Sequence, residues 1–139
     1  MKKLLIIAGI LLLTGSSSLA IDDTVKLSGK DLITFSQNEK WGIKDKNGNI
    51  IIDPIYLKMI RLGDSSWIVQ NKKRKFGLID NKGNILVPIK YNHADRVVSK
   101  FAKFGNNNDY GIYDENGKII VKPEYSKIDI LYGQMFLTY

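Results

Sequence analysis

Acidic residues that could do chemistry recur in this chain at one position of a short motif, Asp-x-x-Gly. The three copies of the motif are Asp45/Gly48, Asp80/Gly83 and Asp114/Gly117. Two carboxyl groups facing each other across a groove could hydrolyse a glycan. These acids, together with Glu115, instead occupy positions typical of turns between strands. We therefore predict no catalytic acid pair, and a small hydrolase of envelope glycans remains an alternative function.

The same motif could suggest a calcium loop, which needs alternating oxygen ligands over about twelve residues and a closing bidentate Glu. Asp45 and Asn47 are the only such ligands in the first copy, and Lys82 stands in the second copy where the first has Asn47. Turn formation explains the motif without a metal. The sequence predicts neither a metal site nor a cofactor.

Nucleophilic catalysis has few candidates, because the chain has no Cys and His93 is its only His. Asp95 could orient that imidazole, and a serine would complete a Ser-His-Asp arrangement. No Ser stands in a nucleophile-elbow motif, and the polar neighbours of His93 favour an ordinary loop residue. We predict that the protein is not an enzyme.

The strongest local charge is the run Lys72, Lys73, Arg74 and Lys75. It falls between two predicted strands, near residues 67–69 and 76–80. A solvated turn that discourages edge-to-edge aggregation would account for the run. Its functional interpretation is contact with an acidic protein, an anionic envelope polymer or a lipid surface. Nucleic acid is not an expected partner, because aromatic residues do not alternate with these cations.

The Asp-x-x-Gly motif belongs to a longer repeat with a period of 35 and then 34 residues, which is typical of repeat proteins. Each copy opens on an aromatic–Gly pair and closes on a tyrosine. The pairs are Trp41-Gly42, Phe76-Gly77 and Tyr110-Gly111, and the closing tyrosines are Tyr56, Tyr91 and Tyr125.

Each copy is predicted to form three antiparallel strands. The Asp opens a three-residue loop, a type I turn followed by Gly in the left-handed region, and its carboxylate accepts a backbone bond from two residues on. The next strand is apolar on both faces in every copy (residues 50–52, 85–87 and 119–121), so we expect it to be covered on both sides and to end at Pro54, Pro88 or Pro123. Residues 56–62 and 91–98 could each hold one helical turn.

The repeated aromatic and glycine are interpreted as packing positions. We expect Trp41, Phe76 and Tyr110 to be buried in equivalent places. We also expect the first and last residues of each apolar run to be buried. A bulky ring lying over the glycine backbone would explain why Gly always follows the aromatic.

The N-terminus has the features of a signal peptide: a basic start (Lys2 and Lys3), an apolar run over residues 4–13, and small residues up to Ala20. The apolar run is shorter than the roughly 20 residues of a spanning helix. We predict cleavage near Ala20, export to the periplasm or the medium, and no transmembrane segment afterwards. Cleavage would remove two of 21 basic residues against 14 acidic ones, and so reduce the net charge from +7 to +5.

Taken together, these motifs resemble the WG repeat family, although only the first copy keeps the Trp. The resemblance implies a β-rich repeat module in bacterial, often exported, proteins, without a shared enzymatic activity. The predicted division is a signal peptide (1–20), an N-terminal extension (21–31) and a β domain (32–139). The copies lie near 32–60, 67–97 and 101–130, and a partial strand covers 135–139. We predict an all-β fold of tandem antiparallel three-stranded units, with β-trefoil-like closure as the alternative.

The function that these features favour is an exported, non-enzymatic module that binds a protein or an anionic envelope component. Repeat units of this kind present extended surfaces. A purely structural protein without a ligand is a further alternative, beside the glycan hydrolase.

Overall fold

The computed structural model describes residues 29–98, 100–131 and 133–139, so the predicted signal peptide lies outside the described residues. The chain there is all-β, with one short 3-10 turn, η1 (Gly29–Asp31), and no α-helix. The thirteen strands are β1 (Leu32–Gln37), β2 (Lys40–Asp45), β3 (Ile50–Tyr56), β4 (Lys58–Leu62), β5 (Ser66–Gln70), β6 (Phe76–Asp80), β7 (Ile85–Tyr91), β8 (His93–Val98), β9 (Phe101–Gly105), β10 (Tyr110–Asp114), β11 (Ile119–Tyr125), β12 (Lys127–Leu131) and β13 (Gln134–Thr138).

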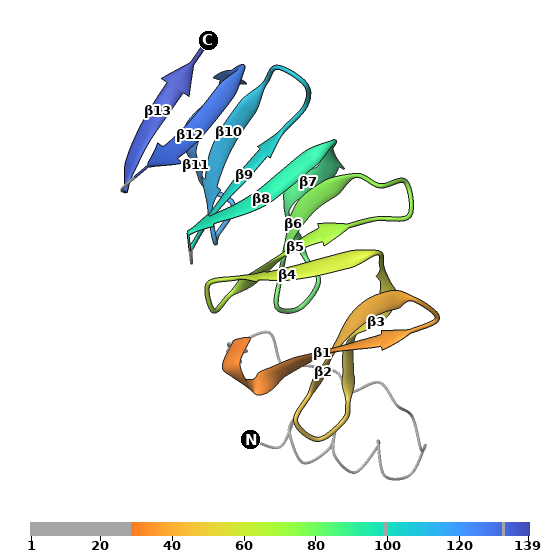
Figure 1. The fold of residues 1–139 in the computed structure, drawn as a ribbon. Coiled ribbons are helices and arrows are strands. Elements are labelled where there is room, and N and C mark those ends of the chain that lie inside the picture. Colours follow the sequence, from red (N-terminus) through yellow and green to blue (C-terminus); the bar gives the residue numbers. More distant parts are fainter. Residues whose placement is uncertain (1–28, 99, 132) are drawn as a thin grey trace.

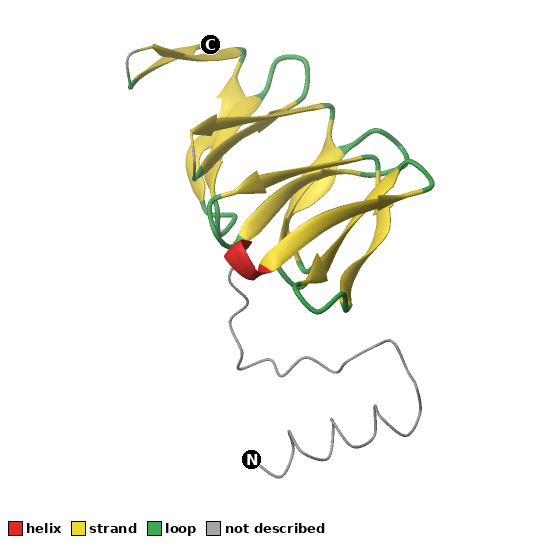
Figure 2. Ribbon diagram, turned by 60° about the horizontal axis from the view of Figure 1, so that its bottom comes forward, coloured by secondary structure: helices red, strands yellow, loops and turns green. Residues whose placement is uncertain are grey.

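These strands form four antiparallel sheets in tandem, in the orders β1-β2-β3, β4-β5-β6-β7, β8-β9-β10-β11 and β12-β13. The sheets follow one another along the molecule, from β1–β3 at the bottom of Figure 1 to β12–β13 at its top. Seen from a second direction, they remain separate layers joined by short loops (Figure 2). The prediction of tandem antiparallel β units is confirmed, and the described sheets do not close into the barrel that a trefoil would need.

The links that follow Tyr56, Tyr91 and Tyr125 differ from the prediction. Residues 56–62 and 91–98 were expected to hold at most a helical turn, and that expectation is wrong. Each link forms a strand instead: β4, β8 or β12. The two central sheets therefore have four strands, because each link strand pairs with the first strand of the next repeat.

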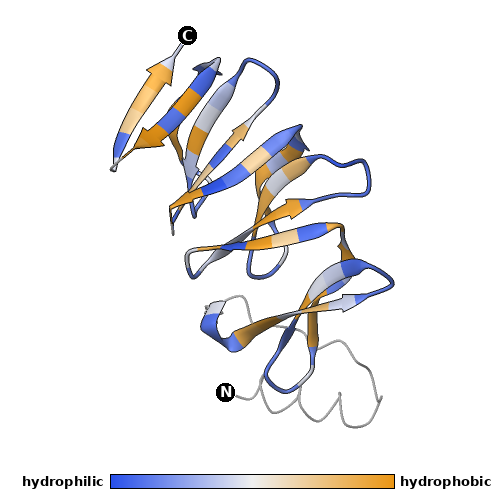
Figure 3. Cartoon of the chain, viewed as in Figure 1, coloured by the Kyte–Doolittle hydropathy of each residue, from blue (hydrophilic) through white to orange (hydrophobic). Residues whose placement is uncertain are grey.

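The core lies between neighbouring sheets, and the central strands contribute to it from both faces. In β5 the side chains alternate: Trp67 and Val69 pack toward the first sheet, whereas Ile68 packs toward the third. Phe104 of β9 is fully buried on the third sheet, in the cluster that contains Ile68. Hydrophobic residues therefore concentrate along the strands and hydrophilic ones along the loops (Figure 3).

The strand after each Asp-x-x-Gly turn is not covered on both sides as predicted. Ile52 and Val87 are buried, but Ile50, Ile85 and Ile119 are exposed. The exposed isoleucines begin β3, β7 and β11, next to the turn and outside the core clusters that hold Ile52 and Val87. These three strands are edge strands of their sheets. The strands also continue beyond Pro54, Pro88 and Pro123 to the closing tyrosine. A proline is tolerated there because an edge strand needs fewer backbone donors.

Candidate functional site

The three Asp-x-x-Gly turns have the predicted conformation. Gly48, Gly83 and Gly117 all have φ between +82° and +92°. In the first copy the Gly48 N–H donates to the Asp45 carbonyl (3.1 Å), and the Asn47 and Asn49 N–H groups donate to the Asp45 Oδ1 (2.9 Å each). Asp80 and Asp114 make the equivalent bonds. These carboxylates hold the backbone of the turn.

The electrostatics of Asp45 follow from those bonds. Burial acts to raise the pKa of Asp45, but the hydrogen bonds from the Asn49 side chain and from the backbone of Asn49, Asn47 and Gly48 outweigh it. The pKa therefore lies below its ordinary value, and the carboxylate is ionised at neutral pH. A general acid in glycan hydrolysis needs the opposite shift, so Asp45 is chemically suited to its structural role.

The aromatic residues of the three aromatic–Gly pairs occupy equivalent positions, opposite the closing tyrosines: Trp41 faces Tyr56, Phe76 faces Tyr91 and Tyr110 faces Tyr125. The prediction that they are buried is wrong. Trp41 is 40% exposed, and Phe76 and Tyr110 are half-buried. The closing tyrosines Tyr56 and Tyr91 take the buried places instead.

The glycines of the pairs are required by a neighbouring backbone, not by a ring. At Gly77 a Cβ would lie 2.6 Å from the Val87 carbonyl oxygen and 2.7 Å from the Ile89 Cα. Gly42 and Gly111 face the corresponding backbone of β3 and β11. At each of these positions the register of the strand pair shifts, which brings the bulged strand across the glycine. The prediction that another group closely approaches each glycine is confirmed, but that group is the backbone of the edge strand and not an aromatic ring.

The basic run forms the loop between β5 and β6. Lys72, Lys73 and Arg74 are exposed, and Lys75 is half-buried, with its ammonium donating to the Asn92 side chain. Asn71 closes this loop, because its Oδ1 accepts from the Lys73 and Lys75 N–H groups at 3.0 Å each. The three exposed cations therefore project from a loop whose shape depends on Asn71 and the backbone.

The β5–β6 loop is part of a larger basic surface. We define the loop edge as the loops that follow β1, β3, β5, β7, β9 and β11, with the one strand residue that flanks each loop on either side. In Figure 1 the β1–β2, β5–β6 and β9–β10 loops project from the right-hand ends of their sheets. Seven basic residues lie on it: Lys40, Lys58, Lys72, Lys73, Arg74, Lys75 and Lys127. Its acidic residues are Glu39 and Asp109.

The opposite ends of the strands have a balanced charge. We define this turn edge as the described residues of the loops that follow β2, β4, β6, β8, β10 and β12, with their flanking strand residues. The basic residues there are Lys46, Lys82, Lys100 and Lys118, and the acidic ones are Asp45, Asp64, Asp80, Asp114 and Glu115. By these definitions the loop edge carries a net charge of +5, from seven basic and two acidic residues, and the turn edge carries −1, from four basic and five acidic residues.

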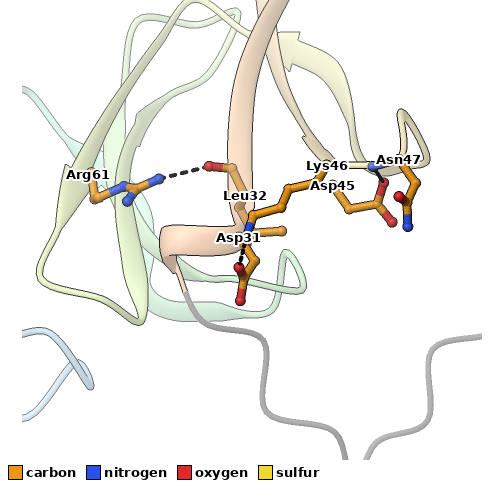
Figure 4. Close-up of polar contacts among 6 residues, drawn as sticks. All are labelled: Asp31, Leu32, Asp45, Lys46, Asn47 and Arg61. Atoms are coloured by element: carbon orange, nitrogen blue, oxygen red, sulfur yellow. Dashed lines mark hydrogen bonds and ion pairs between the residues drawn. The ribbon is translucent and has the colours of Figure 1, made fainter.

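The residue that follows the Asp of each Asp-x-x-Gly turn differs in every copy, and its side chain contacts another part of the protein along the turn edge. Lys46 pairs with Asp31 (2.6 Å), as Figure 4 shows. Asn81 is buried, and its Oδ1 accepts from the Trp67 indole N–H (2.9 Å). Glu115 reaches the neighbouring sheet, where its Oε2 accepts from the Asp64 N–H (3.0 Å) and the Ser65 hydroxyl (2.9 Å). Glu115 is thus a structural contact between repeats.

The structure does not assemble the His93–Asp95 pair as a catalytic unit. His93 begins β8 and is exposed, and its ring centre lies 6.1 Å from that of Tyr110. The Asp95 carboxylate is 3.8 Å from the Lys103 ammonium. Within the described residues, no group of three or more His, Cys, Asp or Glu side chains could hold a metal. No helix among them is long and apolar enough to cross a membrane.

Two cavities on the described surface were missed by the sequence reasoning. One is an open, polar cavity of about 580 Å³ beside the β4–β5 loop, lined by Arg61 and Arg96. The other is apolar, with a volume of about 200 Å³, and lies between the third sheet and β12–β13. Neither involves the basic run. Arg61 and Arg96 share one place in the repeat, five residues after Tyr56 and Tyr91, and that spacing is the signal that could have found them.

A buried pair of tyrosines joins the second and third sheets. The hydroxyls of Tyr91 and Tyr113 lie 3.0 Å apart in the core. Burial, the hydrogen bond with Tyr91 and the charge of Tyr91 together raise the pKa of Tyr113 above its ordinary value near 10. The folded protein therefore holds this proton more tightly than the unfolded chain does. The stability that results is complete below pH 10 and is lost as the pH rises above it.

We accordingly expect the free energy of unfolding to fall as the pH rises from 9 to 11.5. The double variant Tyr91→Phe/Tyr113→Phe removes both hydroxyls, so neither is left unpaired, and its stability at pH 7 should change little. Its loss of stability above pH 10 should be shallower than in the wild type. Some pH dependence should persist, because burial also raises the pKa of Tyr56. Urea unfolding at each pH measures both curves, and parallel curves would contradict the role of this pair.

Comparison with known proteins agrees with the repeat seen in the structure. A family model described as WG containing repeat matches residues 41–58, 76–108 and 110–135. No curated protein and no solved structure matches the chain. The three matched segments correspond to the three copies of the motif.

Proposed function

Because this chain belongs to the WG containing repeat family, we propose that it is an exported, non-enzymatic repeat module that binds an anionic polymer of the cell envelope through its loop edge. The observation that carries the proposal is the charge of that edge, which has seven basic residues and two acidic ones; of the seven, Lys127 pairs with Asp129 at 2.9 Å. Export is proposed from the N-terminal sequence, whose basic start and short apolar run are those of a signal peptide.

The position of the cations supports a binding role. Lys72, Lys73 and Arg74 are exposed on a loop held by Asn71, and within the described residues none of the three has a carboxylate within 4.0 Å. Their charge is therefore available to a partner. Neighbouring cations on the same edge, such as Lys40 and Lys58, extend the positive surface along the stacked sheets, which suits an elongated anionic chain.

The acids of the turns favour binding over hydrolysis. Asp80 Oδ1 accepts from the Lys82 and Asn84 N–H groups (2.9 and 2.8 Å), and Asp114 Oδ1 accepts from Asn116 and Lys118 in the same way (2.9 Å each). Carboxylates engaged with the backbone are poorly placed to exchange protons with a substrate.

The test is retention of the mature domain on an immobilised acidic polymer, polyglutamate, at 0.1 M and 1 M salt. The wild type should be retained at low salt and released at high salt, because the Debye length falls from about 10 Å to about 3 Å. The variant Lys72→Gln/Lys73→Gln/Arg74→Asn should elute at a markedly lower salt concentration. Its stability should stay within about 0.5 kcal/mol of wild type, since the replaced side chains are exposed.

The matched control removes three charges from the turn edge, as Lys46→Gln/Lys82→Gln/Lys118→Gln. This variant has the same net charge as the loop variant. If binding is specific to the loop edge, the control variant should elute at a salt concentration close to that of wild type. Equal elution of the two variants would show that net charge alone drives retention and would overturn the proposal. Release of shortened glycans from an envelope polysaccharide by the wild type would favour the hydrolase instead.

A further inference from the structure

A second positively charged site lies at the other end of the strands, in the cavity of about 580 Å³. Its walls come from two sheets: the end of β4 with the β4–β5 loop, and the end of β8 with Lys100. The charged residues that line it are Arg61, Asp64, Arg96 and Lys100, with Val97 and Val98 beside them. Its size is within the range of small-molecule sites, roughly 300–1,000 Å³.

The two arginines are equivalent residues of successive repeats. Arg61 stands five residues after Tyr56, and Arg96 stands five residues after Tyr91. Because the second and third sheets pack on each other, this equivalence places the two side chains at one junction, where Arg96 Nη1 donates to the Arg61 carbonyl (3.2 Å). The third copy has Ile130 at this position, so among the described repeats only the second and third sheets bring two arginines together.

Arg61 is held in place before any ligand arrives. Its Nη2 donates to the Leu32 carbonyl (2.9 Å), as Figure 4 shows, and its guanidinium lies 4.8 Å from the centre of the Trp67 ring. Trp67 is its direct partner across β4 and β5. Arg96 faces the small Ala102 in the equivalent pair, which leaves its side chain free to reach across to the second sheet. An immobilised guanidinium loses less entropy on binding.

The positive charge of the cavity is only partly offset by the protein, through Asp64 in the lining and the Glu115 carboxylate, which accepts from the Asp64 N–H beside Gly63. Among the described residues, no carboxylate lies within 4.0 Å of Arg61, Arg96 or Lys100. Asp64 is the one acid among the lining residues, against three cations. Each guanidinium has five N–H donors in a planar fork, and the structure uses few of them.

We propose that this cavity binds an oxyanion, a carboxylate or a phosphate, carried by a small ligand of about the size of a sugar acid. Arg61 and Arg96 supply paired N–H donors to its oxygens, as planar guanidinium groups commonly do. Lys100 adds a positive charge at the rim. The site is separate from the loop edge, so either proposal can fail without the other.

The experiment is an NMR titration of the isotope-labelled domain with three probes: glucuronate, inorganic phosphate and neutral glucose. Glucuronate or phosphate should shift the backbone amides of Gly63, Asp64 and Val97 in a saturable way, and glucose should not. The probe with the lower Kd identifies whether the carboxylate or the phosphate is the preferred oxyanion. Shifts that rise linearly without saturation, or that spread evenly over all lysine-bearing loops, would overturn the proposal.

Two variants that each remove two positive charges distinguish a specific binding site from non-specific electrostatic attraction. Arg61→Gln/Arg96→Gln should weaken binding at least tenfold, whereas Lys72→Gln/Lys73→Gln on the loop edge should leave Kd within twofold of wild type. Since Arg61 also packs on Trp67, Arg96→Gln alone provides a variant of an exposed residue that keeps the fold, with an expected loss of at least fivefold. Arg96→Lys should restore only part of the affinity, because Lys keeps the charge but loses the planar fork. An unchanged Kd in Arg96→Gln would contradict the site.

Discussion

Replacing Phe104 with alanine should lower the free energy of unfolding by about 3–5 kcal/mol, the usual cost of truncating a buried aromatic residue. Phe104 is fully buried between the second and third sheets. Its ring centre lies 5.7 Å from that of Tyr91 and 5.5 Å from that of Tyr113, in an edge-to-face arrangement with the latter. The total free energy of unfolding of a small domain is about 5–15 kcal/mol, so the variant should be close to unfolding at 37 °C.

The matched comparison is Trp41→Ala, a larger truncation at a position that is 40% exposed. Urea unfolding of the two variants should give a clearly smaller loss for Trp41 than for Phe104, because less apolar surface is removed from the core. If Trp41→Ala were the more destabilising of the two, the repeat aromatic would be the energetic centre of the fold and the contacts between sheets would be secondary.

Replacing Gly77 with alanine should lower the free energy of unfolding by about 3 kcal/mol, the upper end of the range for overpacking a well-packed site. The added methyl would lie 2.6 Å from the Val87 carbonyl oxygen, and the colliding group is backbone that cannot rotate away. Relief would require β6 and β7 to separate at the bulge. Both the midpoint of urea unfolding and the melting temperature should fall.

Gly48→Ala is the control for this prediction. At Gly48 nothing lies within 4 Å of an added Cβ, but φ is +88°. Its expected cost is about 1–2 kcal/mol, from the left-handed conformation alone. An equal or larger loss of stability for Gly48→Ala than for Gly77→Ala would mean that the close approach of β7 is not the main reason why the repeat has glycine at position 77.

Burial was the property hardest to predict from the pattern of residues. Residues 50, 51 and 52 are all isoleucine, yet Ile50 is exposed, Ile51 half-buried and Ile52 buried. The difference comes from which side chain meets the neighbouring sheet, a property of the whole fold: Ile52 lies in the core cluster with Trp67 and Val69 of β5, and Ile50 lies outside it. The link strand β4 was missed for a related reason: it pairs with β5 of the next repeat, so its conformation depends on residues outside its own copy.

The two candidate sites also differ in how far they could be predicted from the sequence. The basic loop could be located from the sequence, because four adjacent cations between two strands must share one loop wherever the strands lie. The cavity could not, since Arg61 and Arg96 are 35 residues apart and meet only when two sheets stack. The larger basic surface of the loop edge also collects residues from separate repeats, such as Lys40 and Lys127.

What the sequence determined by itself is local: the period of the repeat, the strand–turn–strand order, and the conformation of each Asp-x-x-Gly turn. Asp45 shapes its turn by bonding to Asn47 and Asn49, only two and four residues away, so that geometry depends on neighbouring residues alone. The tertiary structure decided which strands lie at sheet edges, which aromatic residues are buried, and where Arg61 meets Arg96. Those outcomes depend on packing between residues tens of positions apart, where the energy of a contact exists only after the sheets have stacked.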